Sequence, residues 1–176
     1  DLVMASELVT PEKINFMAKE GRGLICVSLT KERAIDLDLE LVQNKNTSLY
    51  ETNFTVSVDA KNNTTTGISA FDRSETIRVL IHNKSKAKDL ARPGHIFPII
   101  GKDGGVLRRA GHTEASIDLS LLAGLKPSGV ICEIMDDDGS MSRGDSLQKF
   151  AKKHSLKIIS IADLIHFRRK TQKLVE

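Results

Sequence analysis

The chain contains no tryptophan, and aromatic residues make up only 4% of its 176 residues. Side chains on which nucleic-acid bases stack are therefore scarce. Charge of one sign is not in strong excess either, because 26 basic residues are balanced by 23 acidic ones and the net charge is +3. Part of the basic excess lies at residues 168–170, where a solvated helix face explains it. This balance argues against a nucleic acid as partner and leaves a small anion open.

Long apolar runs and disulfide-type cysteine patterns are also missing. No stretch approaches about 18 apolar residues, the length that a membrane-spanning helix requires, and no apolar signal-like segment opens the sequence. Cys26 and Cys132 both lie in apolar runs. Two isolated thiols of this kind indicate buried, reduced cysteines, so we expect a cytoplasmic protein without a membrane partner.

The pattern that is present is typical of one globular domain spanning residues 1–176, with 40% hydrophobic and 28% charged residues. Thr10 and Pro11 favour the start of a helix that ends at Gly21. Further helices are predicted at residues 72–81, 113–122, 147–154 and from 162 onward. Strands are predicted at residues 24–29, 54–58, 96–100, 130–135 and 157–161, and residues 102–105 predict a hairpin-type turn. We therefore expect a single α/β (α+β) domain with a mixed sheet flanked by helices.

The first segment suited to chemistry is Arg92-Pro93-Gly94-His95. A rigid turn there delivers a histidine to the start of a strand, where it can act as an acid or a base. A histidine that merely caps a loop fits the same residues, because loops often carry histidine. The segment alone leaves both interpretations open.

The second segment spans residues 108–114. Small residues at Ala110 and Gly111 let backbone N–H groups approach an anion, and the helix start that follows adds partial positive charge. Arg109 and the hydroxyl of Thr113 complete a cradle for a phosphate group. His112 can bind a metal or move a proton in this setting. A capped helix start with exposed arginines is the alternative.

The third segment is the strand-like run that contains Glu133. A carboxylate among apolar neighbours needs a hydrogen-bonding partner or a raised pKa. Glu133 is therefore a candidate for proton transfer, although a glutamate that faces solvent at the end of a strand fits the alternation equally well.

These segments occur together and in a fixed order. Residues 64–73 read TTTGISAFDR, residues 92–98 read RPGHIFP, residues 104–115 read GGVLRRAGHTEA, and residues 129–133 read GVICE. This combination resembles the 3,4-dihydroxy-2-butanone 4-phosphate synthase family along essentially the whole chain. The resemblance implies a homodimer of mixed α/β domains with active sites near the subunit interface. It also implies a magnesium-dependent lyase that converts ribulose 5-phosphate to L-3,4-dihydroxy-2-butanone 4-phosphate and formate in riboflavin biosynthesis.

The resemblance also implies roles for individual residues. His95 and Glu133 match two residues regarded as essential for catalysis, and we expect them to move protons. His112 matches the histidine that binds Mg²⁺, for which Mn²⁺ is an alternative. Asp72 and Cys26 match positions that line the pocket. The positions that match substrate-binding residues are Asp1, Arg109, Ala110, Gly111, His112, Thr113 and Glu133.

The two ends of the sequence also carry expectations from the resemblance. Asp1 matches the last residue of an acidic family loop that supplies a glutamate to the metal, and the domain's first helix and strand come before that loop. Without those carboxylates we expect the chain as given to be inactive or weakly active. The tail from Phe167 resembles the stretch that leads into a GTP cyclohydrolase II domain in bifunctional members.

Two functions of other classes stay open at this point. A non-catalytic phosphate-binding domain would use the cradle at residues 109–113 without turnover. A metal hydrolase could use His95, His112 and Glu133 as ligands. The sequence has no pair of histidines four apart on a helix, the spacing typical of zinc, which argues against the hydrolase.

Overall fold

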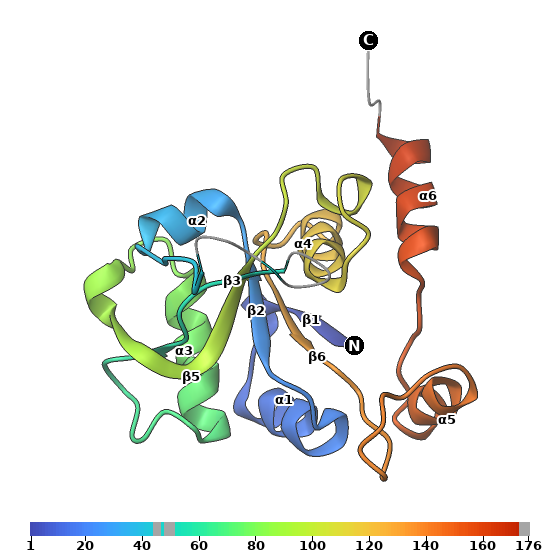
Figure 1. Cartoon of the computed structure of the whole chain (residues 1–176), viewed down its shortest axis with the longest axis horizontal. Coiled ribbons are helices and arrows are strands. Elements are labelled where there is room, and N and C mark those ends of the chain that lie inside the picture. Colours follow the sequence, from blue (N-terminus) through green and yellow to red (C-terminus); the bar gives the residue numbers. More distant parts are fainter. Residues whose placement is uncertain (44–46, 48–51, 173–176) are drawn as a thin grey trace.

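A mixed six-stranded sheet forms the centre of the computed structural model, which describes residues 1–43, 47 and 52–172. Its strand order is β1-β6-β2-β5-β3, and β4 also pairs with β5. β2 runs parallel to β5 and antiparallel to β6, so the expected mixed sheet is confirmed (Figure 1). The strands are β1 (Leu2–Ala5), β2 (Cys26–Leu29), β3 (Asn53–Phe54), β4 (Val58–Ala60), β5 (Leu90–Ile100) and β6 (Gly129–Cys132).

Helices flank this sheet. None of those in the described part of the chain is long and apolar enough to cross a membrane. The α-helices are α1 (Pro11–Phe16), α2 (Lys31–Asp36), α3 (Ala70–Ile81), α4 (His112–Leu122), α5 (Asp145–Lys153) and α6 (Ile161–Thr171). Shorter helical turns are η1 (Ser6–Leu8), η2 (Met17–Gly21), η3 (Ala87–Asp89) and η4 (Gly105–Leu107).

Local signals in the sequence set the ends of several helices. The Thr10 hydroxyl accepts the Lys13 N–H at 3.3 Å at the start of α1. The π-helical turn η2 then carries the chain to Gly21, and Arg22 ends it with a left-handed φ of 70°. The helix predicted to start at Thr10 and Pro11 and to end at Gly21 is therefore confirmed. The helix predicted at residues 72–81 is confirmed as α3.

The two faces of the sheet are covered differently. α1 and α3 pack on one face, where Ile14, Val27, Leu80 and other side chains of the main core are fully buried. α4 covers the second face over β1, β6 and β2. The Ser116 hydroxyl on α4 lies 2.7 Å from the Ser28 hydroxyl on β2, which ties the helix to the sheet.

Two predictions differ from the structure. Residues 102–105 form the expected turn, in which the Gly105 N–H donates to the Lys102 carbonyl at 3.1 Å. The turn does not connect a hairpin, because β5 is already paired with β2, β3 and β4 and the chain enters η4 and α4 instead. Residues 157–161 do not form a strand in the described structure. Residues 157–160 are irregular and Ile161 begins α6. None of the strands in the described part of the chain pairs with this segment.

Other strands differ in length from the prediction. The strand expected at residues 54–58 is divided between β3 and β4, with an irregular stretch between them. β5 begins six residues earlier than expected, at Leu90, and β6 ends earlier, at Cys132. Cys26 and Cys132 are buried and free, as expected.

A buried ion pair fastens α6 to the rest of the molecule. The Arg168 guanidinium donates to Oδ2 of Asp118 on α4 at 2.7 Å and to the Gly104 carbonyl at 2.9 Å. The side chains of Arg168 and Asp118 are only 13% and 6% exposed. The Val106 N–H also donates to Asp118, so one carboxylate joins α4, α6 and η4.

Arg168→Met should therefore lower the free energy of unfolding by about 3–5 kcal/mol, because it leaves a buried carboxylate without its counter-ion. Urea unfolding measures the change, and Arg169→Met, at an exposed neighbouring position, is the matched control. A loss no larger than that of the control would contradict the proposed fastening role of the pair.

Candidate active site

His95 lies in an irregular stretch inside β5. Val58 of β4 pairs with Ile96, whereas Asp59 and Ala60 pair with Ala91 and Leu90. The register therefore shifts between Val58 and Asp59, and residues 92–95 pair with no residue of β4. Gly94 allows this close packing, because a Cβ built on it would lie 2.0 Å from the carbonyl carbon of Val58. Bulges re-aim side chains next to functional sites. Here the bulge turns His95 toward Asp59.

The Asp59 carboxylate holds both the backbone and the ring of His95. Its Oδ1 accepts the His95 backbone N–H at 2.8 Å, and its Oδ2 lies 2.7 Å from the ring nitrogen Nδ1. The Asp59 side chain is 14% exposed, whereas that of His95 is 42% exposed. The carboxylate therefore lies on the inner side of the ring, and the outer side of the ring faces solvent.

Glu133 lies on the same face of the sheet as His95. Cys26 of β2 pairs with Phe97 of β5 and with Ile131 of β6, and these side chains belong to one cluster. His95 comes two residues before Phe97, and Glu133 two residues after Ile131, so strand alternation gives both the same face. Strands lie about 4.8 Å apart, so their backbones, separated by β2, are about 10 Å apart.

The Glu133 carboxylate is anchored to β2 just before that strand begins. The Leu24 N–H donates to its Oε2 at 2.9 Å. Gly23 leaves the space for this arrangement, because a Cβ built on it would lie 2.6 Å from the backbone N, the backbone O and Oε2 of Glu133. Glu133, which follows an apolar run in the sequence, thus has a specific hydrogen-bonding partner in the backbone N–H of Leu24.

Cys26 and Asp72, the other two residues expected to line the pocket, are a buried thiol and a buried carboxylate. Burial raises the pKa of the Cys26 thiol to about 12, and the charge of Glu133 adds to this effect. The thiol is therefore protonated at neutral pH, which argues against a role as nucleophile. The Asp72 carboxylate accepts hydrogen bonds from the Thr65 hydroxyl and N–H and from the Gly67 N–H. Asp72 thus orders the loop beside His95.

The residues predicted to hold a phosphate group, 109–113, lie just before and at the start of α4. The Arg109 guanidinium donates to Oε2 of Glu114 at 2.6 Å, and Glu114 is 1% exposed. A Cβ on Gly111 would lie 2.2 Å from Nη1 of Arg109, so the absence of a side chain at Gly111 leaves the space that the Arg109 guanidinium occupies. Ala110 is exposed, but Thr113 is buried beneath the turn. Substrate contact by the Thr113 hydroxyl stays a prediction.

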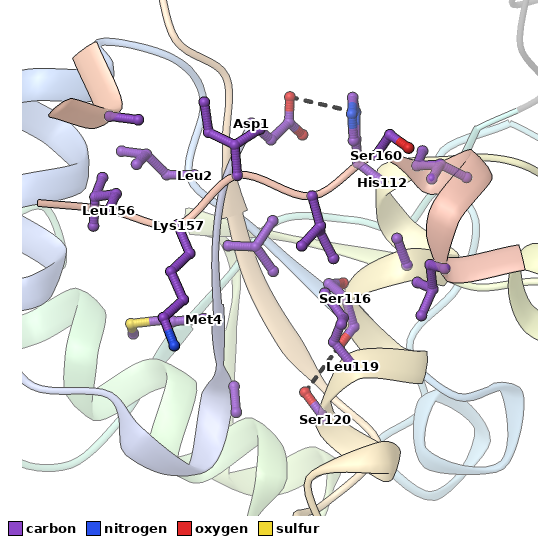
Figure 2. A pocket seen from close by; sticks show the side chains of 18 of the residues that line it. Asp1, Leu2, Met4, His112, Ser116, Leu119, Ser120, Leu156, Lys157 and Ser160 are labelled. Atoms are coloured by element: carbon purple, nitrogen blue, oxygen red, sulfur yellow. Dashed lines mark hydrogen bonds and ion pairs between the residues drawn. The ribbon is translucent and has the colours of Figure 1, made fainter. Parts of the chain in front are cut away.

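His112 and Asp1 face each other at the rim of a cavity of about 580 Å³ (Figure 2). Nδ1 of His112 lies 3.4 Å from Oδ1 of Asp1. Burial is the main cause that lowers the pKa of His112, and the positive charge of Arg109 acts in the same direction. The ring is therefore neutral at pH 7, the form that binds metals. Deeper in the cavity the lining is mostly apolar, with Leu119 among its side chains, so it offers little acid–base chemistry.

A magnesium ion fits these residues only with help from other ligands. His112 could supply one nitrogen and Asp1 one carboxylate, and the described residues contain no group of three His, Cys, Asp or Glu side chains suited to a metal. Magnesium is often held by one or two carboxylates, with waters and substrate oxygens completing its shell. The same observation argues against a hydrolase that would bind metal through His95, His112 and Glu133.

The structure thus brings His95, Glu133 and the start of α4 to one face of the sheet. Sequence reasoning missed Asp59 and Glu114, the buried carboxylates that hold His95 and Arg109. Glu114 lies five residues after Arg109, in the first turn of α4. This short spacing in the sequence could have predicted that the two side chains form an ion pair. No comparable signal connected Asp59 to His95.

Comparison with known proteins decides the family. The family model for 3,4-dihydroxy-2-butanone 4-phosphate synthase matches residues 1–167. The chain belongs to the 3,4-dihydroxy-2-butanone 4-phosphate synthase family. It is 61% identical to the riboflavin biosynthesis protein RibBA of Aquifex aeolicus, covering 100% of this chain and 44% of the relative. It is 53% identical to the 3,4-dihydroxy-2-butanone 4-phosphate synthase of Photobacterium phosphoreum, covering 100% of this chain and 48% of the relative. The chain therefore spans less than half the length of these two relatives.

Solved structures of the synthase family agree with the fold. A two-domain synthase, RibBX from A. baumannii, superposes with a TM-score of 0.93 at 47% identity, covering 97% of this chain and 50% of that one. A synthase in complex with two magnesium ions superposes with a TM-score of 0.92 at 43% identity, covering 97% of this chain and 84% of that one.

Gly23→Ala should displace Glu133 and lower the free energy of unfolding by about 1–3 kcal/mol, because the added Cβ overlaps backbone atoms that cannot swing away. Gly21→Ala is the matched control, since its Cβ would lie 3.1 Å from its nearest neighbours instead of 2.6 Å. Urea unfolding compares the two variants. Equal stability of Gly23→Ala and Gly21→Ala would show that the Glu133 segment is not packed as described.

Proposed function

We propose that this chain is a lyase that converts D-ribulose 5-phosphate to L-3,4-dihydroxy-2-butanone 4-phosphate and formate in riboflavin biosynthesis. Membership of the synthase family supports the reaction. The observation that carries it at the level of residues is that His95 and Glu133 share one sheet face beside the start of α4. Two acid–base groups about 10 Å apart, next to a helix start that favours anions, suit a small sugar phosphate.

His95 and Glu133 are the proposed proton-transfer residues. The reaction must begin with removal of a proton beside the carbonyl of the substrate, and later steps return protons to oxygen or carbon. Two groups on opposite sides of β2 can serve different carbons of one five-carbon chain. The exposed side of the His95 ring and the Glu133 carboxylate are the atoms that would take and give these protons.

The phosphate of the substrate is proposed to bind at residues 109–113. The buried Glu114 holds the Arg109 guanidinium at the start of α4, where the first backbone N–H groups of a helix lack intrahelical partners. Ala110, Gly111 and Thr113 complete this stretch. Asp1, beside His112, is proposed to accept hydrogen bonds from the sugar hydroxyls.

We further propose that His112 is a ligand of magnesium. A magnesium ion bound there would stabilise negative charge on adjacent substrate oxygens. The neutral ring of His112 and the neighbouring Asp1 carboxylate support this assignment, as does the magnesium in a synthase of closely similar fold. Manganese, which accepts similar ligands, is the proposed substitute.

A homodimer in the cytoplasm is the proposed working form. Ile68 and Phe71, 53% and 70% exposed, follow the loop that Asp72 orders beside His95, and a second copy of the chain would bury them. The buried, free cysteines suit a reducing compartment. Sedimentation velocity tests the dimer, for which a species of twice the chain mass is expected; a single-chain mass at micromolar concentration would contradict it.

The decisive experiment is formate release from ribulose 5-phosphate with magnesium, by purified protein that also carries the acidic loop which the resemblance places before Asp1. We expect His95→Ala and Glu133→Gln each to lower kcat by at least about 100-fold, the usual size of a general acid–base contribution. His166→Ala, at an exposed histidine on α6, is the control that should retain the full rate. Unchanged turnover in either site variant would remove that residue from catalysis. Absence of formate from the unaltered protein would favour a non-catalytic phosphate-binding domain.

Removal of the metal should abolish turnover. Excess chelator is expected to stop formate release, and added magnesium should restore it. His112→Ala should raise the magnesium concentration needed for half-maximal rate by at least about tenfold, because the neutral imidazole would be lost from the site. A rate that is insensitive to chelator, or an unchanged magnesium requirement in the variant, would contradict the assignment of the metal.

A further inference from the structure

We propose that Arg168, on α6, is a positioning residue for the phosphate cradle, residues 109–113. This inference rests on the proposed function, since it presumes that a phosphate group binds there. The sequence favoured a solvated helix face for residues 168–170. The Arg168 side chain is instead only 13% exposed, and it contacts α4 and the turn before α4.

The backbone of Arg109 depends on the turn that leads from β5 into α4. Within this turn the N–H groups of Arg108 and Arg109 both donate to the Gly105 carbonyl, at 2.9 and 3.1 Å. The Gly111 N–H then donates to the Arg109 carbonyl at 2.9 Å. The interactions that fix Gly105 therefore also fix the backbone of the phosphate cradle.

Arg168 and Asp118 hold the two peptide groups on either side of Gly105. Nη1 of Arg168 donates to the Gly104 carbonyl at 2.9 Å, and the Val106 N–H donates to Oδ2 of Asp118 at 2.8 Å. The same Oδ2 accepts Nη1 of Arg168 at 2.7 Å. A Cβ on Gly105, where φ is +63°, would lie 2.1 Å from Oδ1 of Asp118 and 2.5 Å from Nη1 of Arg168. The ion pair is thus packed directly against the turn.

The guanidinium of Arg168 is itself held in one orientation. Its Nε and Nη2 donate to the side-chain oxygen of Gln172 at 3.0 and 2.9 Å, while Nη1 faces Asp118 and the Gly104 carbonyl. The Asp118 side chain is only 6% exposed, so water competes little for these hydrogen bonds. A planar fork fixed at all three nitrogens gives the turn a rigid support.

Glu114 holds the same turn from another side. Its Oε1 accepts the Lys102 N–H at 3.0 Å, and its Oε2 accepts the Arg109 guanidinium at 2.6 Å. Glu114 and Asp118 lie about one turn apart on α4, but only Asp118 takes its cation from α6, which packs against α4 and η4 (Figure 1). The backbone of the phosphate cradle therefore depends on where α6 lies, and Arg168 is the link.

Arg168→Lys is the informative substitution. It keeps the positive charge that the buried Asp118 carboxylate needs, so the protein is expected to fold. It removes the fork, because the lysine ammonium is a single compact donor group that cannot serve Asp118, Gly104 and Gln172 in the same geometry. The turn at Gly105 then loses part of its support while the charge of the site is unchanged.

We expect Arg168→Lys to raise the Kd for inorganic phosphate by at least about tenfold, measured by NMR titration of the Gly111 amide. The KM for ribulose 5-phosphate should rise by a similar factor, with kcat changed less than about threefold, because His95 and Glu133 lie on other segments. Arg169→Lys, at an exposed neighbouring position, is the matched control and should leave all three values unchanged. A folded Arg168→Lys protein whose phosphate Kd lies within about threefold of that of the unaltered protein would overturn the inference.

A second measurement needs only the unaltered protein. If phosphate and α6 act on the same turn, bound phosphate must in return stabilise the contacts of that turn. Saturating inorganic phosphate should slow amide hydrogen exchange at Val106, whose N–H donates to Asp118, more than at Val27, which reports any general stabilisation of the main core. Equal effects at Val106 and Val27 would overturn the inference even if Arg168→Lys failed to fold, and so would the absence of phosphate binding. Phosphate binding without formate release would contradict the proposed function instead, and the exchange rates would still decide the role of Arg168.

Discussion

The pairing of β2 with two neighbours of opposite direction fixes the arrangement of the whole sheet. β2 is parallel to β5 and antiparallel to β6, and Cys26 pairs across to both strands. This register decides which side chains of three strands share a face. One face buries the main core beneath α1 and α3, and the other carries His95, Glu133 and the start of α4. A shift of one residue in either pairing would turn a catalytic candidate into the core.

Buried carboxylates place the functional side chains on that face. Asp59 holds His95, Asp72 holds the loop that covers this pair, and Glu114 holds Arg109. Each of these acidic side chains has charged or N–H partners, which a carboxylate needs when it is removed from water. Asp118 serves the fold in the same way by joining α4 to α6. The site is therefore preorganised by interactions made inside the protein before any substrate binds.

The sequence predicted much of this arrangement where the signals are local. The helix at residues 72–81, the helix start after Gly111 and the strand before Glu133 follow from periodicity and capping, and the structure contains all three. Local signals failed where pairing decides. The apolar residues 157–161 have the composition of a strand but no strand beside them. The contact between Asp59 and His95 joins residues 36 positions apart through a bulge, which a single sequence does not encode visibly.

We propose that a sugar phosphate lies across β2, with its phosphate at the start of α4 and its carbon chain between His95 and Glu133. The most direct test is a crystal structure of the protein with ribulose 5-phosphate, in which calcium replaces magnesium to slow turnover. We expect phosphate density beside Arg109 and the sugar between the His95 ring and the Glu133 carboxylate. Substrate bound instead in the apolar cavity beneath Asp1 and Leu119, or away from both side chains, would contradict it.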